Sequence, residues 1–273
     1  MTTLELHLGD CLEVLKTIPA KSIDLIICDL PYGCLTTGND TRKRFIDGKD
    51  TGTTITHETI GGCAWDIKID LEKFWEQVKR IRRNEHSPTI HFCTTKFGYD
   101  LIKSNEKEFH YDLVWDKQKG VSFLLANKMP MRSHEMIYVF SKAGAYYNRK
   151  DIEGDFPKSL VSKKVMERKT ITGEMVPKII KDNTGKRCVV SVINNINKYS
   201  NDRIVKQHPT EKPVELYKWL IERFCPPNGT VLDPTFGSCN SGQASLNLER
   251  NYIGVEKDEG FCKKACERFD IEF

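Results

Sequence analysis

Residues 23–29, IDLIICD, restrict the fold of this chain more than any other stretch. The run is almost continuously apolar, which is typical of a central β-strand that is covered on both faces. Further strand patterns occur at 4–10, 88–94, 111–117, 134–142, 230–233 and 251–258, with helical patterns between several of them. This alternation predicts an α/β fold, doubly wound, with a mostly parallel sheet and helices on both of its faces.

The composition is that of a globular enzyme or binding protein, with 39% hydrophobic and 29% charged residues among 273. No apolar run approaches the roughly 20 residues of a membrane span. The N-terminus lacks the basic start and apolar core of a signal peptide, so we expect the protein to stay in the compartment where it is made. Ten cysteines are scattered without a CxxC pair, which favours reduced thiols and no metal site.

Positive charge is concentrated in one part of the chain. Residues 141–207 contain fifteen Lys and Arg against seven Asp and Glu, although the whole chain has a net charge of only +4. A basic segment within an otherwise acidic chain suggests local binding of a polyanion, and a solvated lysine-rich insertion is the alternative. Residues 34–64 contain the sequence TRKR and read as a long loop, which is typical of a lid or a binding loop.

Two strand ends carry residues suited to chemistry. The strand pattern that begins at residue 23 runs into DLPY, residues 29–32. The strand pattern at 230–233 runs into DPTFGSCNSG, residues 233–242. In parallel sheets, ligands bind beyond the carboxyl ends of the strands. Small residues before a helix allow a ligand to approach backbone N–H groups, and Glu256, at the end of the next strand, can accept both hydroxyls of a ribose. A plain structural turn remains the alternative for this motif.

Together with HPTEKP, residues 208–213, these motifs resemble the amino-methyltransferases that use S-adenosylmethionine. Their order resembles the circularly permuted β group of DNA methyltransferases. The resemblance implies a seven-stranded Rossmann-like methyltransferase sheet with an antiparallel edge hairpin. It also implies a catalytic domain formed by residues 1–144 and 208–273, with a target-recognition insertion at 145–207.

The resemblance implies that DLPY holds the amine to be methylated. Asp29 and the backbone carbonyl of Leu30 would each accept a hydrogen bond from an amine N–H, which aims the lone pair of the amine at the methyl donor. Pro31 would fix the corner. Tyr32 would stack on a target base that has left the duplex. For Asp29 and Tyr32 the structural alternatives are a turn cap and a rim aromatic.

The donor side is implied by the same resemblance. His208, Thr210 and Lys212 would approach the methionine carboxylate of the donor, with Lys212 as its ion partner. Asp10 would lie near the donor's adenine, and an N-cap role for Asp10 is equally compatible with the sequence. The complete set of expected donor contacts is Asp10, Cys11, His208, Thr210, Lys212, Asp233, Pro234, Phe236, Gly237, Ser238, Glu256 and Lys257.

Contacts with DNA are expected from basic residues and from one aromatic residue. Basic side chains in the insertion would neutralise phosphates, and polar ones would read base edges. The expected contacts are Arg42, Lys43, Arg44, Trp65, Lys117, Arg149, Lys163, Lys164, Arg168, Lys169, Lys186 and Arg187.

Three residues depart from the family pattern. Leu30 stands where the motif has its first proline, Thr235 where Phe is usual, and Cys239 where a second glycine is usual. Any residue supplies the carbonyl required at position 30. A cysteine at 239 would be strained if the backbone there needs a positive φ.

The leading hypothesis is a site-specific DNA N6-adenine methyltransferase of a restriction–modification system or of a phage or virus, acting on double-stranded DNA. The resemblance thus implies a cytoplasmic protein of a bacterium or of a cell infected by a phage or virus. Asp at position 29 favours adenine, because the N4-cytosine enzymes of this resemblance more often carry Ser. The alternatives are methylation of cytosine, an RNA base or a glutamine, and a DNA-binding module with an inactive transferase site. Relatives of this group often pair, so a homodimer is an expectation.

Overall fold

The computed structural model describes side chains in residues 2–32, 68–121, 123, 126–151, 188–197 and 211–273. For strands in residues 41–46, 49–56, 152–153, 167–169, 175–177 and 186–187 it describes the backbone. The chain divides into two compact units, which are Met1–Asn148 with Ser191–Phe273, and Arg149–Val190.

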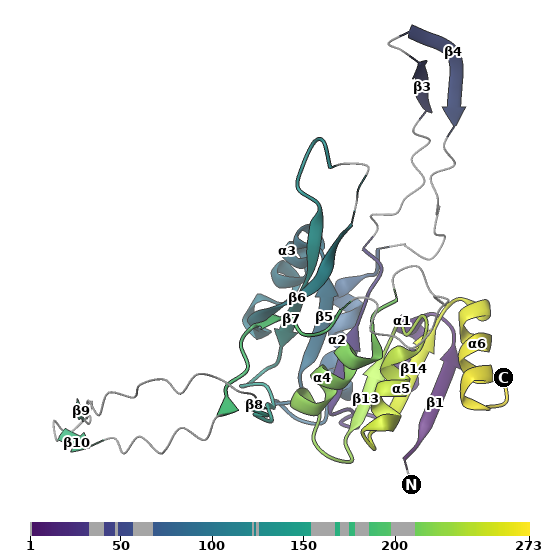
Figure 1. Ribbon diagram of the computed structural model, residues 1–273. Coiled ribbons are helices and arrows are strands. Elements are labelled where there is room, and N and C mark those ends of the chain that lie inside the picture. The colour runs from purple at the N-terminus through teal and green to yellow at the C-terminus, as the bar shows by residue number, and fades with distance from the viewer. Residues whose placement is uncertain are drawn as a thin grey trace. The chain divides into compact units, whose positions relative to one another are not determined.

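An eight-stranded sheet forms the centre of the larger unit (Figure 1), with the strand order β1-β14-β13-β2-β5-β7-β6-β12. In this order the bounds are Leu4–Leu8, Asn251–Glu256, Thr230–Asp233, Leu25–Cys28, Thr89–Cys93, Arg132–Phe140, Phe109–Val121 and Val192–Ile193. All pairs are parallel except those that β7 makes with β5 and β6. The predicted mostly parallel sheet is confirmed. The predicted count of seven strands is exceeded because the two-residue strand β12 adds to the edge.

Helices cover both faces of the sheet because its strands are apolar on both sides. In β2 every residue is buried. Leu25 and Ile27 belong to one hydrophobic cluster, and Ile26 and Cys28 belong to the other. The first cluster packs on α4 (Val214–Phe224), α5 (Asn240–Asn247) and α6 (Glu259–Phe269), and the second packs on α1 (Cys11–Thr17), α2 (Leu71–Ile81) and α3 (Thr95–Ser104).

Four of these helices begin after an N-cap residue whose side chain accepts a backbone hydrogen bond, which explains where each of these helices starts. Asp10 caps α1, Asp70 caps α2, Thr94 caps α3 and Asp258 caps α6, each by accepting a hydrogen bond from a backbone N–H of the first turn. The ends of β1, β5 and β14 are therefore followed directly by helix N-termini. A short 3₁₀ helix, Glu106–Glu108, connects α3 to β6.

Two regions that were expected to be irregular contain short strands. In the predicted loop 34–64, β3 (Thr41–Ile46) and β4 (Lys49–Thr56) form an antiparallel pair. In the smaller unit, β8 (Ile152–Glu153) pairs with β11 (Lys186–Arg187), and β9 (Glu167–Lys169) pairs with β10 (Met175–Pro177). Both ends of the predicted insertion, 145–148 and 191–207, fall within the range of the larger unit. The target-recognition role of this region stays a prediction.

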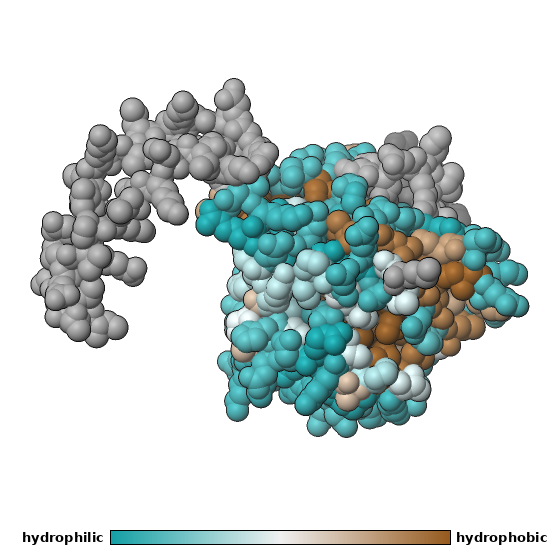
Figure 2. Space-filling model, turned by 90° about the horizontal axis from the view of Figure 1, so that it is seen from below, coloured by the Kyte–Doolittle hydropathy of each residue, from teal (hydrophilic) through white to brown (hydrophobic). Residues whose placement is uncertain are grey.

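Figure 2 shows the end of the molecule at which the parallel strands begin. Hydrophilic residues cover much of this face, and hydrophobic residues gather on one side of it. The expected site residues follow the opposite ends of the strands. No helix within the described residues is long and apolar enough to cross a membrane.

Candidate active site

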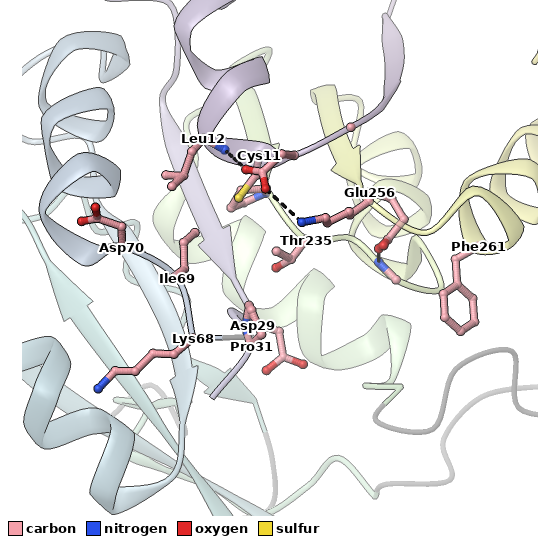
Figure 3. Close-up of a pocket in the computed structure, with 15 residues that line it drawn as sticks. Cys11, Leu12, Asp29, Pro31, Lys68, Ile69, Asp70, Thr235, Glu256 and Phe261 are labelled. Carbon is pink, nitrogen blue, oxygen red and sulfur yellow. Dashed lines mark hydrogen bonds and ion pairs between the residues drawn. The ribbon is translucent and has the colours of Figure 1, made fainter. Parts of the chain in front are cut away.

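A cavity of about 220 Å³ lies at the carboxyl ends of the parallel strands. Its lining comes from the ends of β1, β2, β13 and β14 and from the helices or turns that follow them (Figure 3). It is far larger than the ~30 Å³ that a water molecule occupies, so it has the size to receive an organic ligand. The lining includes Asp29 and Pro31 of the predicted acceptor corner, and Pro234, Thr235 and Gly237 of the predicted donor turn.

Hydrogen bonds inside the donor turn fix its shape. The Asp233 carboxylate accepts from the Thr235 backbone N–H at 3.0 Å and from the Ser241 hydroxyl at 2.6 Å. Burial raises the pKa of Asp233 to about 7. Asp233 therefore organises the turn from within the protein and is not part of the cavity lining.

Two residues of this turn have left-handed backbone conformations. Gly237 has φ 54°, which glycine adopts without strain. Cys239 has φ 56° and ψ 33°, and its side chain is completely buried. The sequence departure at position 239 therefore places a strained cysteine where glycine would be relaxed. The hydroxyl of Thr235 is buried without a hydrogen-bond partner in the described part of the chain, and Thr235 lines the cavity.

Glu256, the last residue of β14, is hydrogen-bonded to the donor turn. Its carboxylate accepts hydrogen bonds from the backbone N–H groups of Gly237 and Asp258, both at 2.9 Å. Burial raises the pKa of Glu256, although these backbone bonds oppose the shift. Each oxygen keeps a lone pair for a further donor, so the predicted acceptance of ligand hydroxyls is compatible with this geometry.

Asp10 has the N-cap role that was considered for it from the sequence, and its position near a donor's adenine stays a prediction. One carboxylate oxygen accepts from the Leu12 N–H at 3.0 Å and caps α1, and the other pairs with Lys257 Nζ at 3.1 Å (Figure 3). Both residues also line the cavity, as does Cys11. Burial raises the pKa of the Cys11 thiol to about 12, so this side chain is an unreactive part of the cavity lining.

At the acceptor corner, the Asp29 carboxylate already has two partners. The Tyr32 hydroxyl donates to Oδ1 at 2.7 Å, and Lys212 Nζ pairs with Oδ2. The ring of Tyr32 packs 5.0 Å from that of Phe97 on α3. The side chain of Leu30 is buried in the core, so a contribution from this residue to the cavity falls to its backbone.

Lys212 and Lys117 are placed differently from what the sequence predicted. Lys212 holds Asp29 and lies 3.7 Å from Glu135 Oε2, and it does not line the cavity at which it was expected to meet a donor carboxylate. Burial lowers the pKa of Lys212, but the carboxylates of Asp29 and Glu135 outweigh this effect and raise it overall. Lys117 is buried against Glu135 at 3.2 Å, so it is not exposed to a phosphate backbone.

Several residues that were expected to contact the donor or DNA lie away from the cavity or outside the residues that the structure describes. Phe236 is buried in the core, and the backbone carbonyl of Ser238 accepts a hydrogen bond from Arg268. Arg149 is exposed and pairs with Asp151. Outside the described residues lie His208, Thr210, Trp65, Lys163 and Lys164. The backbone is described, without side chains, for Arg42, Lys43, Arg44, Arg168, Lys169, Lys186 and Arg187.

Sequence reasoning missed part of the cavity wall. Leu12, Ile69 and Phe261 contribute apolar surface, and Gly9, Lys68 and Asp70 also line the cavity. Leu12 and Phe261 lie in the first turns of helices that follow β1 and β14, so their positions after strand ends were an available signal. Ile69 directly precedes the cap of α2, and its side chain gave no such signal.

Comparison with known proteins identifies the relatives of this chain. The sequence model of a family described as DNA methylase matches residues 23–267. The Type II methyltransferase M.HinfI of Haemophilus influenzae is 28% identical over 95% of this chain, which spans 66% of the length of that relative. The DNA adenine methyltransferase YhdJ of Escherichia coli K12 is 25% identical over 96% of this chain and 81% of its own length.

A solved structure shares the fold. PvuII DNA methyltransferase, which is cytosine-N4-specific, matches with a TM-score of 0.62 at 17% identity, over 98% of this chain and 87% of that one. At this level of identity the match shows a common fold.

Proposed function

Because the chain belongs to the DNA methylase family, we propose that it transfers a methyl group from S-adenosylmethionine to the exocyclic amino group of a base in double-stranded DNA. The base proposed is adenine, methylated at N6. The observation that carries this proposal is the single cavity lined by Asp29 and Pro31 on one side and by the turn at Pro234–Gly237 on the other. Methyl transfer requires donor and acceptor groups in one such space.

The donor half of the cavity fits S-adenosylmethionine. Glu256 offers carboxylate oxygens to ribose hydroxyls, and Ile69, Leu12 and Phe261 offer apolar surface to a purine ring. Thr235 also lines this half of the cavity, and its hydroxyl has no hydrogen-bond partner among the described residues. When bound, the sulfonium supplies an electrophilic methyl group.

The acceptor half suits an aromatic amine. The lone pair of such an amine is delocalised into the ring, which makes it a weak nucleophile. The Asp29 carboxylate and the Leu30 carbonyl each accept one N–H, which holds the amine with its lone pair toward the donor side of the cavity. Since the donor is already activated, orientation supplies much of the rate. A C–N bond forms as the S–CH₃ bond breaks, and the amine then releases a proton.

The proposed substrate is DNA because of the family and because of the basic segment at 141–207. The base must leave the duplex to enter the cavity. Adenine is favoured by Asp29 and by the similarity to YhdJ. N4 of cytosine is the second candidate, which the shared fold with the PvuII enzyme supports. The chain order, with DLPY early and the donor turn late, supports the permuted β group.

The test is methyl transfer from labelled S-adenosylmethionine to unmethylated duplex DNA, followed by nucleoside analysis. We expect labelled N6-methyladenine at a defined sequence, whereas N4-methylcytosine would select the second candidate. Asp29→Ala is expected to abolish transfer, and Asp112→Ala, an exposed aspartate of β6, serves as the matched control. If wild-type protein transferred no label, the proposal would be refuted. Calorimetry with the donor then identifies an inactive DNA-binding module if no heat is released.

A further inference from the structure

Four charged side chains of alternating sign run from the acceptor corner into the protein: Asp29, Lys212, Glu135 and Lys117. Lys212 Nζ pairs with Asp29 Oδ2 and lies 3.7 Å from Glu135 Oε2. The Glu135 Oε1 atom accepts a hydrogen bond from Lys117 Nζ at 3.2 Å. Both lysine side chains are only 4% exposed. A buried ammonium group is costly to desolvate, so two of them beside the site indicate a specific arrangement.

The four residues come from separate parts of the sheet edge. Asp29 follows β2, Lys212 precedes α4, Glu135 lies on β7 and Lys117 lies on β6. The ring of Phe92 on β5 lies below Lys212, 4.6 Å from Nζ. Glu135 and Lys117 are not among the residues that line the cavity, and Lys212 is the residue whose ammonium group contacts both Glu135 and Asp29.

We propose that Glu135 and Lys117 are positioning residues for the acceptor, which act through Lys212 on the Asp29 carboxylate. This inference rests on the proposed function, since it concerns how Asp29 is held ready to accept an amine N–H. Lys212 fixes one oxygen of the Asp29 carboxylate. Glu135 also interacts with the ammonium group of Lys212, and the ammonium group of Lys117 balances the negative charge of Glu135.

The balance of charge decides what each substitution does. In Lys117→Met, Glu135 loses its own cation and draws Lys212 away from Asp29. In Glu135→Gln, two buried ammonium groups are left with one carboxylate between them. The double variant removes one charge of each sign and leaves the Lys212–Asp29 pair. The double variant should therefore be less impaired than the two single effects combined.

Other ionisable groups face Asp29, and they stay in place in all these variants. The negative charge of Asp29 contributes to raising the pKa of each of them: Cys28, Tyr32, Cys93, Tyr217 and Asp233. Their contributions are common to wild type and variants, so a difference between the proteins reports on the lysine–glutamate chain.

The experiment combines methyl-transfer kinetics with direct NMR observation of the Asp29 carboxyl group. Methyl transfer is measured between pH 5.5 and 9 for wild type, Lys117→Met, Glu135→Gln, the double variant and Lys117→Arg. Lys103→Met, which removes an exposed lysine of α3, is the matched control. Carbon-13 NMR of labelled aspartate carboxyls follows Asp29, assigned with Asp29→Asn.

We expect Lys117→Met to lower kcat about tenfold with little change in KM for the donor, as is typical of coupling within a charge network. The carboxyl signal of Asp29 at pH 7.5 should move from its wild-type position, because its contact with Lys212 changes. Lys117→Arg and the double variant should recover most of the loss and return the signal toward its wild-type position. Additive losses in the double variant, or an unmoved Asp29 signal in Lys117→Met, would overturn the inference. A wild type without transfer would refute the proposed function, and the NMR signal would still decide this inference.

Discussion

Lowering the pH from 7.5 to 5.0 is expected to weaken the fold through His91, and His91→Phe is expected to remove this effect. His91 lies on β5, is completely buried, and has no hydrogen-bond partner for either ring nitrogen in the described part of the chain. The rings of Phe74, Trp75 and Phe140 surround it, with centroids 5.2–5.6 Å away. Burial lowers the pKa of His91 from 6.5 to about 3.

The sign and size of the effect follow from this shift. Because the folded-state pKa is depressed, the unfolded chain binds the proton first as the pH falls. The free energy of unfolding is therefore unaffected by His91 above pH 6.5, and it decreases as the pH falls from 6.5 toward 3. At about 1.4 kcal/mol per pKa unit, the loss is about 2 kcal/mol at pH 5.0 and about 5 kcal/mol once the pH falls below 3.

Urea unfolding of wild type and His91→Phe at both pH values measures the effect. Asp233 acts in the opposite direction, because burial raises its pKa to about 7 and its protonation favours the folded state. Comparison of the two proteins at the same pH cancels that contribution. The stability of His91→Phe relative to wild type should rise by about 2 kcal/mol between pH 7.5 and 5.0. An equal difference at both pH values would refute the reasoning.

Three further substitutions test the packing around the site and in the core. Cys239→Ala should lower the melting temperature more than Cys239→Gly does, since both lose the buried thiol but alanine retains the roughly 1–2 kcal/mol strain of φ 56°; the reverse order would contradict the strained turn. Arg82→Met should cost about 3–5 kcal/mol in urea unfolding, because it leaves buried Glu108 without its two-pronged partner at 2.8 and 2.9 Å, and neutralising both residues should recover much of it. Gly98→Ala should destabilise by about 1–3 kcal/mol instead of gaining helix propensity, because its Cβ would lie 2.5 Å from the Tyr138 ring; a more stable variant would contradict this.

The regular part of the sheet was predictable because its signals are local. A nearly continuous apolar run identified β2, and a further strand pattern identified β5. The two-residue strand β12 was missed because it is too short to show a periodic pattern. The strands β3 and β4 were missed because their sequences, TRKRFI and KDTGTTIT, do not alternate regularly between apolar and polar residues.

The site was predictable to a similar degree. The motifs placed Asp29, Pro234, Gly237 and Glu256 around one cavity because each follows a strand that ends at the same edge. The partner of Lys212 was not predictable. Lys212 is separated from its partner Asp29 by 183 positions, and no local pattern links the two residues.

A structure of the protein with S-adenosylmethionine bound tests the central claim most directly. We predict that the donor occupies the cavity between Glu256 and Asp29, with its ribose on Glu256 and its methyl group directed toward the Asp29 carboxylate and the Leu30 carbonyl. A donor bound outside this cavity, or with its methyl group directed away from Asp29, would contradict the account.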